Sequence, residues 1–260
     1  MSSSVAWICV GALAALALQA GSAAAQTAAD ADARAAAFIA GYEQRVRPLE
    51  TAAGLAWWEA NVTGDDADFA AKEAAQNRLD EALSDAAAFA ELKALHEGEL
   101  TDPLLQRQIH VLYLAYLEKQ VPAELLRQIT SRSNAIEKAF NVFRARVGDR
   151  EMTDSEVRKV LTDSLDSAER QSVWEASKAV GGVVEAHLKA LVELRNEVAR
   201  QLSFADYHAM QLELNEQSQA DVLALFDELD ELTRGPFEAA KAEIDARLAE
   251  RYGLEVDELR

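Results

Sequence analysis

Apolar residues recur at helical spacing along most of this 260-residue chain. In the stretch LLQRQIHVLYLAYL, the residues Leu105, Ile109, Leu112 and Tyr116 are three or four positions apart and therefore share one face of a helix. Glycine and proline, which interrupt helices, are scarce at 11 and 4 residues. No window alternates between apolar and polar residues for long enough to indicate a β-strand. The pattern predicts an all-α protein, a multi-helix antiparallel array.

Capping residues divide this pattern into separate helices. Asp102 followed by Pro103 indicates a helix start, because proline fits the first helical position. Thr153 and Glu156 form a capping box. Further starts are expected at Pro122, Asp166, Ser218 and Pro236, and Gly253 is expected to be a C-cap. We expect helices near residues 31–62, 66–97, 102–120, 122–147, 154–162, 167–202, 204–216, 218–234 and 236–252.

The N-terminal segment has the composition of a secretory signal. The first 29 residues carry no charged side chain, and an apolar run is followed by the small residues GSAAAQ. We expect a signal peptide at residues 1–25, an Ala-rich, loose leader at 26–39 and a helical region at 40–260. An uncleaved membrane anchor is the alternative, because residues 5–25 are nearly long enough to span a bilayer. In either case we expect the rest of the chain to be periplasmic or extracellular.

Cysteine usage and charge exclude several classes of site and partner. Cys9 is the only cysteine and lies in the predicted signal, so a disulfide or thiolate metal site is not expected in the mature chain. Acidic residues outnumber basic ones by 45 to 26, giving a net charge of −19. This charge argues against nucleic acid and anionic membranes as partners.

The four histidines do not form a recognisable zinc motif. His96-Glu97 begins like the H-E-x-x-H motif, but Leu100 occupies the position of the second histidine, and Gly98 indicates a helix end. His110 is expected to be packed or satisfied by a partner, and His187 to lie on a solvated face. The sequence therefore predicts no metal site and no catalytic residues in this chain, and leaves its substrate-binding residues unknown.

Three other features have a structural and a functional interpretation. The stretch RNEVARQLSFADYHAMQL brings Glu197, Asp206, Tyr207 and His208 within a few turns. These residue types can bind metals and move protons, but we interpret the stretch as a helix–corner–helix joint in which Asp206 caps the second helix. Of the adjacent Trp57 and Trp58, one is expected in the core. Asn61-Val62-Thr63 matches the glycosylation sequon.

Several runs of sequence resemble the angiotensin-converting-enzyme-like zinc peptidyl-dipeptidases, especially the bacterial members. The resemblance covers roughly residues 40–260. It rests on AWWEANVTGDDADFAAKEAAQNRLDEALSD, DPLLQRQIHVLYLAYLEKQ, DSAERQSVWEASKAVG and LVELRNEVARQLSFADYHAMQLELNE. In that family a long helix with an L-R-N-E-x-A-R core ends in a short turn that carries a glycine or small residue, and a second helix follows. Ser203 stands at that turn in this chain, which is expected to strain the joint. The related oligoendopeptidases share the helical architecture.

The resemblance implies a secreted, two-lobed helical zinc peptidase that removes dipeptides from the C-termini of oligopeptides. The N-terminal helices of that family form a lid over the substrate cleft, and its H-E-x-x-H motif lies in the later half. This chain ends at Arg260 before any such motif, so no catalytic residue is carried over. We therefore expect an N-terminal portion of the peptidase that lacks its C-terminal catalytic half, binds no zinc and is inactive alone.

A non-catalytic helical module that binds peptides or a partner is the alternative, and a purely structural helical protein is a third interpretation. The predicted helix 218–234 has a broad apolar stripe formed by Val222, Leu223, Leu225, Phe226, Leu229 and Leu232. An isolated fragment is expected to expose part of this stripe and to self-associate.

Overall fold

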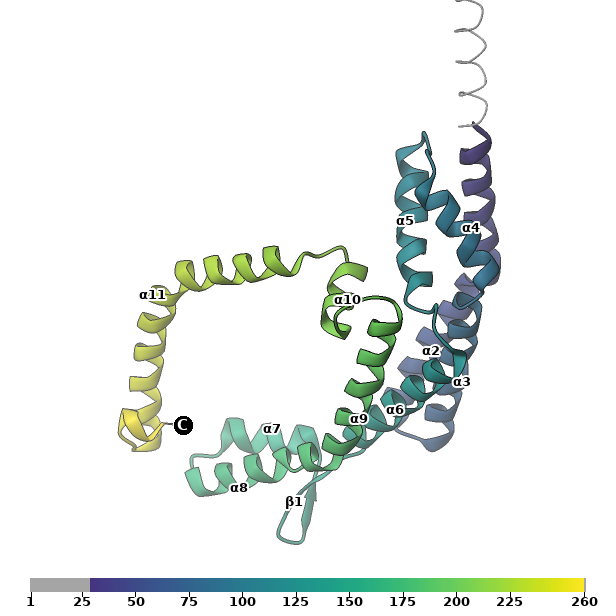
Figure 1. Cartoon of the computed structure of the whole chain (residues 1–260). Coiled ribbons are helices and arrows are strands. Elements are labelled where there is room, and N and C mark those ends of the chain that lie inside the picture. The colour runs from purple at the N-terminus through teal and green to yellow at the C-terminus, as the bar shows by residue number, and fades with distance from the viewer. Residues whose placement is uncertain (1–28, 260) are drawn as a thin grey trace, which may run out of the picture. The chain divides into compact units, whose positions relative to one another are not determined.

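The computed structural model describes residues 29–259, and most of them are helical (Figure 1), so the all-α prediction is confirmed. A helical segment at 29–45 comes first. The labelled helices are α2 (Arg47–Thr63), α3 (Asp66–Leu83), α4 (Ala86–Glu97), α5 (Pro103–Leu117), α6 (Ala123–Asn141), α7 (Asp154–Asp163), α8 (Ser167–Lys178), α9 (Val180–Gln201), α10 (Tyr207–Leu214) and α11 (Gln219–Tyr252). Two short strands, β1 (Ala145–Val147) and β2 (Arg150–Met152), and a 3₁₀ turn, η1 (Val256–Glu258), complete the described elements.

The chain divides into two compact units. The first unit contains the described residues up to Trp57 together with Ala74–Leu126. Its core is formed by the 29–45 segment, the end of α3, and the pair α4 and α5. Leu92 and Ile109 are fully buried there, and Phe38 meets the ring of Tyr116 edge to face at 6.1 Å between centroids.

The second unit contains Trp58–Glu73 and the described residues from Arg127 onward. One cluster packs the β-hairpin against α7 and α8 through the buried side chains of Ala145, Met152, Val157 and Val173. Phe69 is also buried in this unit, and its carbonyl oxygen accepts a hydrogen bond of 2.9 Å from Asn134 Nδ2. This bond fixes the start of α3 against α6.

The capping predictions at Asp102, Thr153, Asp166, Ser218 and Gly253 are confirmed. Thr153 and Glu156 form both hydrogen bonds of a capping box at α7. The carboxylates of Asp102 and Asp166 and the hydroxyl of Ser218 accept N–H groups in the first turns of α5, α8 and α11. Gly253 ends α11 with a φ of 65°.

Two long predicted helices are each divided in the structure. The helix predicted at 31–62 breaks at Val46, because Pro48 lacks the N–H that would continue the hydrogen-bond ladder. The helix predicted at 66–97 breaks before α4, where the carboxylate of Asp85 accepts the N–H groups of Ala87 and Ala88. Both signals are local, and both were missed because apolar spacing continues across the breaks.

The prediction that the chain lacks strands was wrong at residues 145–152. We expected a helix to reach residue 147, but α6 ends at Asn141 and an antiparallel hairpin pairs Val147 with Arg150. Its two-residue loop is Gly148-Asp149, and Gly148 has a φ of 61°, which glycine adopts without a steric penalty. A Gly-Asp pair between short apolar and charged segments is a hairpin signal.

The boundaries of the later helices also differ from the prediction. The helix predicted at 167–202 divides at Ala179 into α8 and α9, next to the poor helix formers Gly181 and Gly182. In contrast, the two helices predicted on either side of Gly235-Pro236 form the single helix α11. Proline removes one hydrogen bond from the ladder, and α11 bends visibly along its length (Figure 1) without ending.

The predicted signal peptide lies outside the described residues, as does the start of the Ala-rich leader. Residues 29–39, expected to be part of a loose leader, belong instead to the first helical segment, in which Ala35 and Phe38 are buried. Alanine is the strongest helix former, and these two side chains give the helix a packed face. Within residues 29–259, every helix is too short or too polar to cross a membrane.

Candidate functional site

The stretch around residues 195–212 is a helix–corner–helix joint, as predicted. Helix α9 ends at Gln201, and Phe204 N–H donates to the carbonyl oxygen of Ala199 across the corner at 2.9 Å. The carboxylate of Asp206 then accepts the N–H of Ala209 at 2.8 Å and caps α10. The structure therefore uses Asp206 to begin a helix.

The remaining polar residues of this joint are engaged structurally or exposed. The side-chain oxygen of Asn196 accepts the N–H of Tyr207 at 2.9 Å, and the guanidinium of Arg195 lies 5.1 Å from the centre of the Tyr207 ring. Glu197 is exposed and accepts a hydrogen bond from Gln201, one turn later on the same helix. His208 is exposed on the first turn of α10. These contacts organise a corner and align no proton-transfer pair between Glu197 and His208.

The backbone of Ser203 has the strain that was expected. Its φ is 70°, in the left-handed region that disfavours side chains. We expect Ser203→Gly to increase the free energy of unfolding by about 1 kcal/mol, because glycine adopts this conformation without a steric cost. Urea unfolding followed by circular dichroism measures the change.

Gly253→Ala is the matched control for this prediction. Gly253 has a nearly equal φ of 65°, and a methyl group there would meet no atom within 4 Å, so its cost is purely conformational. We expect Gly253→Ala to destabilise by a similar amount. A destabilised Ser203→Gly variant would contradict the claim of backbone strain at the corner.

The structure brings together two histidines that the sequence did not connect. His96, in the last turn of α4, and His110, in α5, approach with 2.8 Å between Nε2 and Nδ1. The ring of Tyr113 stacks on His96 at 4.3 Å between centroids, and Phe89 stacks on Tyr113 at 5.6 Å. The expectation that His110 is packed and has a partner is thus confirmed, and its partner is His96.

A hydrogen bond between two imidazoles needs one donor nitrogen and one acceptor nitrogen, so at most one of the two rings can carry a second proton without breaking it. Burial lowers the pKa of His96, and the nearby His110 lowers it further, while the carboxylate of Glu97 acts in the opposite direction. The net direction is downward from the ordinary value of 6.5. The histidine pair therefore favours the neutral state of His96.

This pair predicts a loss of stability in mild acid. Because the pKa of His96 is lower in the folded than in the unfolded state, the unfolded state binds more protons as the pH falls. The contribution of His96 to the free energy of unfolding is expected to be constant above about pH 7.5 and to decrease as the pH falls below about 6.5. Urea unfolding at pH 7.5 and 5.5 measures this difference for the parent chain and for His96→Gln.

His96→Gln should show a smaller loss between the two pH values than the parent. His187→Gln is the control, because His187 is exposed on α9 and its replacement should leave the pH dependence unchanged. An equal loss in the parent and in His96→Gln would show that the pair does not control the acid response.

The described residues do not fit a zinc ion. A catalytic zinc site uses three protein ligands, and residues 29–259 contain no group of three or more His, Cys, Asp or Glu side chains that could hold a metal. His96 and His110 supply two nitrogens, and their rings are only 21° from parallel, with the two nitrogens directed at each other. We assign no hydrolytic step to these residues.

Two further features of the sequence are the adjacent tryptophans Trp57 and Trp58 and the glycosylation sequon at Asn61. Neither tryptophan of the adjacent pair is buried, contrary to the prediction, because Trp57 and Trp58 are 49% and 63% exposed. Asn61 of the sequon is half-buried near the end of α2, where its carbonyl oxygen accepts a hydrogen bond of 2.9 Å from Asn141 Nδ2. This helical, paired position does not resemble the exposed loops that carry N-linked glycans.

Comparison with known proteins identifies the family of the chain. A search of curated proteins finds no match. The family model described as angiotensin-converting enzyme, Peptidase_M2, matches residues 29–257, which is nearly all of the described chain. The earlier resemblance, drawn from residues 40–260, is thereby confirmed. The chain belongs to the angiotensin-converting enzyme family of peptidases.

Proposed function

We propose that the chain is part of a secreted zinc peptidase that releases dipeptides from the C-termini of oligopeptides. The observation that carries this proposal is the family match over residues 29–257, which includes residues of both structural units. The family implies peptide substrates and zinc dependence. The uncharged, apolar N-terminal segment supports export of the chain to the periplasm or the cell exterior.

Within this proposal, these 260 residues do not hydrolyse peptides by themselves. The place where the sequence comes nearest to the zinc motif is His96-Glu97, and there α4 ends at Glu97 with Gly98 as its C-cap. A second histidine four residues later would lie beyond the helix, so one helical face could not present both ligands. In addition, Nε2 of His96 is engaged in a hydrogen bond with Nδ1 of His110. The zinc ligands are therefore proposed to come from a separate segment.

A non-catalytic, secreted helical module that binds peptides or a partner is the second candidate. The observation that favours it is the exposed apolar surface of α11, where Leu225, Phe226 and Leu232 are each more than half exposed. Such a surface is typical of an interaction site.

Zinc content and peptidase activity of the full chain test this assignment together. The chain, expressed alone and incubated with zinc, is expected to retain no stoichiometric metal after dialysis and to release no dipeptides from a synthetic oligopeptide, as followed by mass spectrometry. Stoichiometric zinc with dipeptide release, both lost in His96→Gln/His208→Gln, would overturn the proposed inactivity. Tight oligopeptide binding without cleavage would favour the binding module instead.

A further inference from the structure

The two rings of the histidine pair meet end to end. Nε2 of His96 and Nδ1 of His110 are 2.8 Å apart, and the ring centres are 5.1 Å apart. With ring bonds of about 1.33 Å, each ring atom lies about 1.1 Å from its ring centre, so this separation of centres is close to the largest that the nitrogen contact permits. Both nitrogens therefore lie on the line that joins the ring centres, and their lone-pair directions oppose each other.

Helix packing holds both rings in this arrangement. His96 lies in the last turn of α4 and stacks on the ring of Tyr113, with an interplanar angle of 7°. His110 lies on α5 next to Ile109, which is fully buried. Both histidines belong to the segment Ala74–Leu126, so the whole pair is inside one structural unit. The opposed geometry is thus set by the α4–α5 packing and not by a flexible loop.

Other soft metal ligands are scarce in the described part of the chain. Its two methionines, Met152 and Met210, are buried at 2% and 0% exposure. The remaining histidines, His187 and His208, are exposed on different helices, α9 and α10. The described part of the chain also contains no group of three or more His, Cys, Asp or Glu side chains that could hold a metal. The histidine pair is therefore a site with two nitrogen ligands.

Two opposed nitrogens select the kind of ion that fits. Magnesium and calcium take oxygen ligands, and zinc takes four ligands around a tetrahedron. The monovalent ions Cu(I) and Ag(I), which have a filled d shell, bind two nitrogen donors on one line, and imidazole suits copper. Metal–nitrogen bonds of about 2.0 Å need nitrogens about 4 Å apart, so the rings must separate by roughly 1 Å. His96 is only partly buried and lies at the end of its helix, where its side chain has room to move.

We propose that His96 and His110 form a binding site for one monovalent ion with a filled d shell, Cu(I) or Ag(I), held on the line between Nε2 and Nδ1. The ion replaces the hydrogen atom that the two nitrogens share. In the neutral pair this proton moves to the outer nitrogen of the ring that carried it, so both imidazoles remain neutral and no proton is lost. The site gains one positive charge. This inference rests on the α4–α5 geometry and does not depend on peptidase activity.

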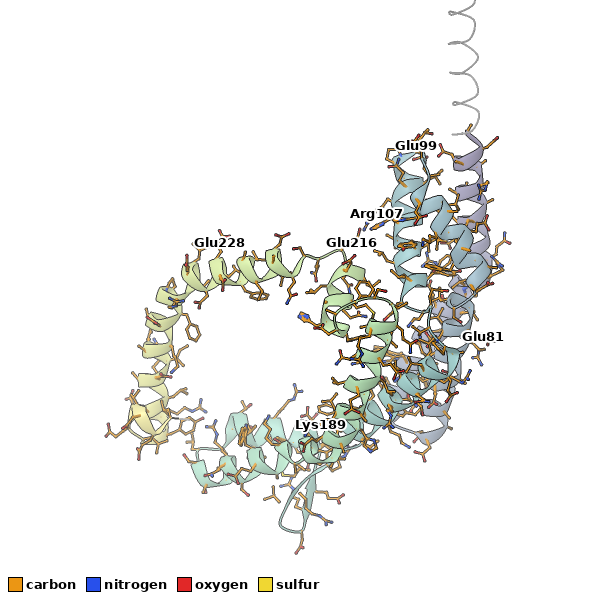
Figure 2. The ribbon with its side chains drawn as sticks, in the orientation of Figure 1. Glu81, Glu99, Arg107, Lys189, Glu216 and Glu228 are labelled. Carbon is orange, nitrogen blue, oxygen red and sulfur yellow. The ribbon has the colours of Figure 1, made fainter. Side chains whose placement is uncertain are left out.

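The charges around the pair are compatible with a bound cation. Burial lowers the pKa of His96, which keeps this ring neutral and able to bind a metal, while the carboxylate of Glu97 acts in the opposite direction. The same carboxylate would stabilise a positive ion at this ring. Glu99 follows in the next loop, and Arg107 lies one turn before His110 on α5 (Figure 2). The chain as a whole carries a net charge of −19, which attracts cations.

Titration of the full chain with silver nitrate in chloride-free buffer tests the proposal. All proteins carry Cys9→Ser, so that the thiol of Cys9 does not bind the ion. By isothermal titration calorimetry we expect one Ag(I) per chain. The midpoint of urea unfolding should rise, because the ion binds the folded state. X-ray absorption of the silver-loaded chain, and of the chain loaded with Cu(I) under a reductant, should show two nitrogen ligands on a line.

Histidine variants locate the bound ion. His96→Gln and His110→Gln should each weaken silver binding at least about tenfold, since even the loss of a group that only orients a ligand costs that much. His187→Gln/His208→Gln is the matched control and should keep the affinity of the parent. Helical circular dichroism checks that each variant is folded. His96→Gln is decisive if His110→Gln does not fold, because His96 lies at the end of α4.

Four results would overturn the proposal. The first is the absence of stoichiometric silver binding, and the second is equal affinity of the parent and His96→Gln. The third is loss of binding in His187→Gln/His208→Gln, which would place the ion at the exposed histidines. The fourth is an X-ray absorption spectrum with sulfur ligands, which would place the ion at the methionines.

Discussion

Asp80→Ala is expected to destabilise the chain by about 3 kcal/mol, because it leaves a buried ammonium group with an incomplete counter-charge. Asp80 lies on α3 and is only 4% exposed. Its carboxylate lies 3.3 Å from Nζ of Lys119 and accepts a hydrogen bond of 3.0 Å from Gln76. Urea unfolding followed by helical circular dichroism measures the change.

The electrostatics of Lys119 explain the size of this effect. Burial by itself lowers the pKa of Lys119, but the carboxylates of Glu118 and Asp80 outweigh it and the pKa is raised. Without Asp80, the ammonium keeps Glu118 but loses its more deeply buried partner. We therefore expect the destabilisation by Asp80→Ala to lie at the lower end of the range observed when one partner of a buried ion pair is removed.

Two further variants identify the cause of the Asp80 effect. Asp80→Leu/Lys119→Met removes both charges and should recover most of the lost stability, because no buried charge is left unpaired. Lys93→Ala breaks an exposed pair with Glu97 in the same unit and should change stability little. A double variant as unstable as Asp80→Ala would show that the loss of stability comes from altered packing and not from the unpaired charge of Lys119.

Leu92→Ala is expected to destabilise the chain by about 2–5 kcal/mol, through loss of buried apolar area and the cavity that remains. Leu92 is fully buried in the core that joins α4 and α5 to the first helical segment. The same urea titration measures this loss. A loss near the lower value would mean that the surrounding side chains move in to fill the cavity, and a loss near the upper value that the cavity stays open.

Leu104→Ala is the matched control for Leu92→Ala. Leu104 lies on the first turn of α5 and is 64% exposed, so the same truncation removes little buried area. We expect a change within about 0.5 kcal/mol. Equal losses for the two variants would contradict the assignment of the α4–α5 core as the stabilising centre of the first unit.

Local signals in the sequence were sufficient for most helix starts. Asp102, Thr153 and Ser218 cap helices through hydrogen bonds that reach no further than three residues, so short sequence patterns determine them. Pro48 and the Gly148-Asp149 pair carried equally local signals that apolar periodicity obscured. The strained φ of Ser203 was anticipated only through the family resemblance.

Long-range pairings could not be predicted from the sequence. The His96–His110 hydrogen bond depends on how α4 packs against α5, and the Asp80–Lys119 pair joins positions 39 residues apart. Periodicity shows which face of a helix is apolar but not which helix covers it. The stripe of residues 222–232 and the exposure of part of it were expected from the sequence, while the structure shows which of its side chains are exposed.

We propose that this chain is part of an active, dipeptide-releasing peptidase whose zinc ligands come from another segment. The most direct measurement captures the native product from the source cell with an antibody to residues 29–259 and assays dipeptide release from an oligopeptide by mass spectrometry. We predict release that a zinc chelator abolishes, while the 260-residue chain expressed alone releases none. A captured product with no dipeptide-releasing activity would contradict the proposal.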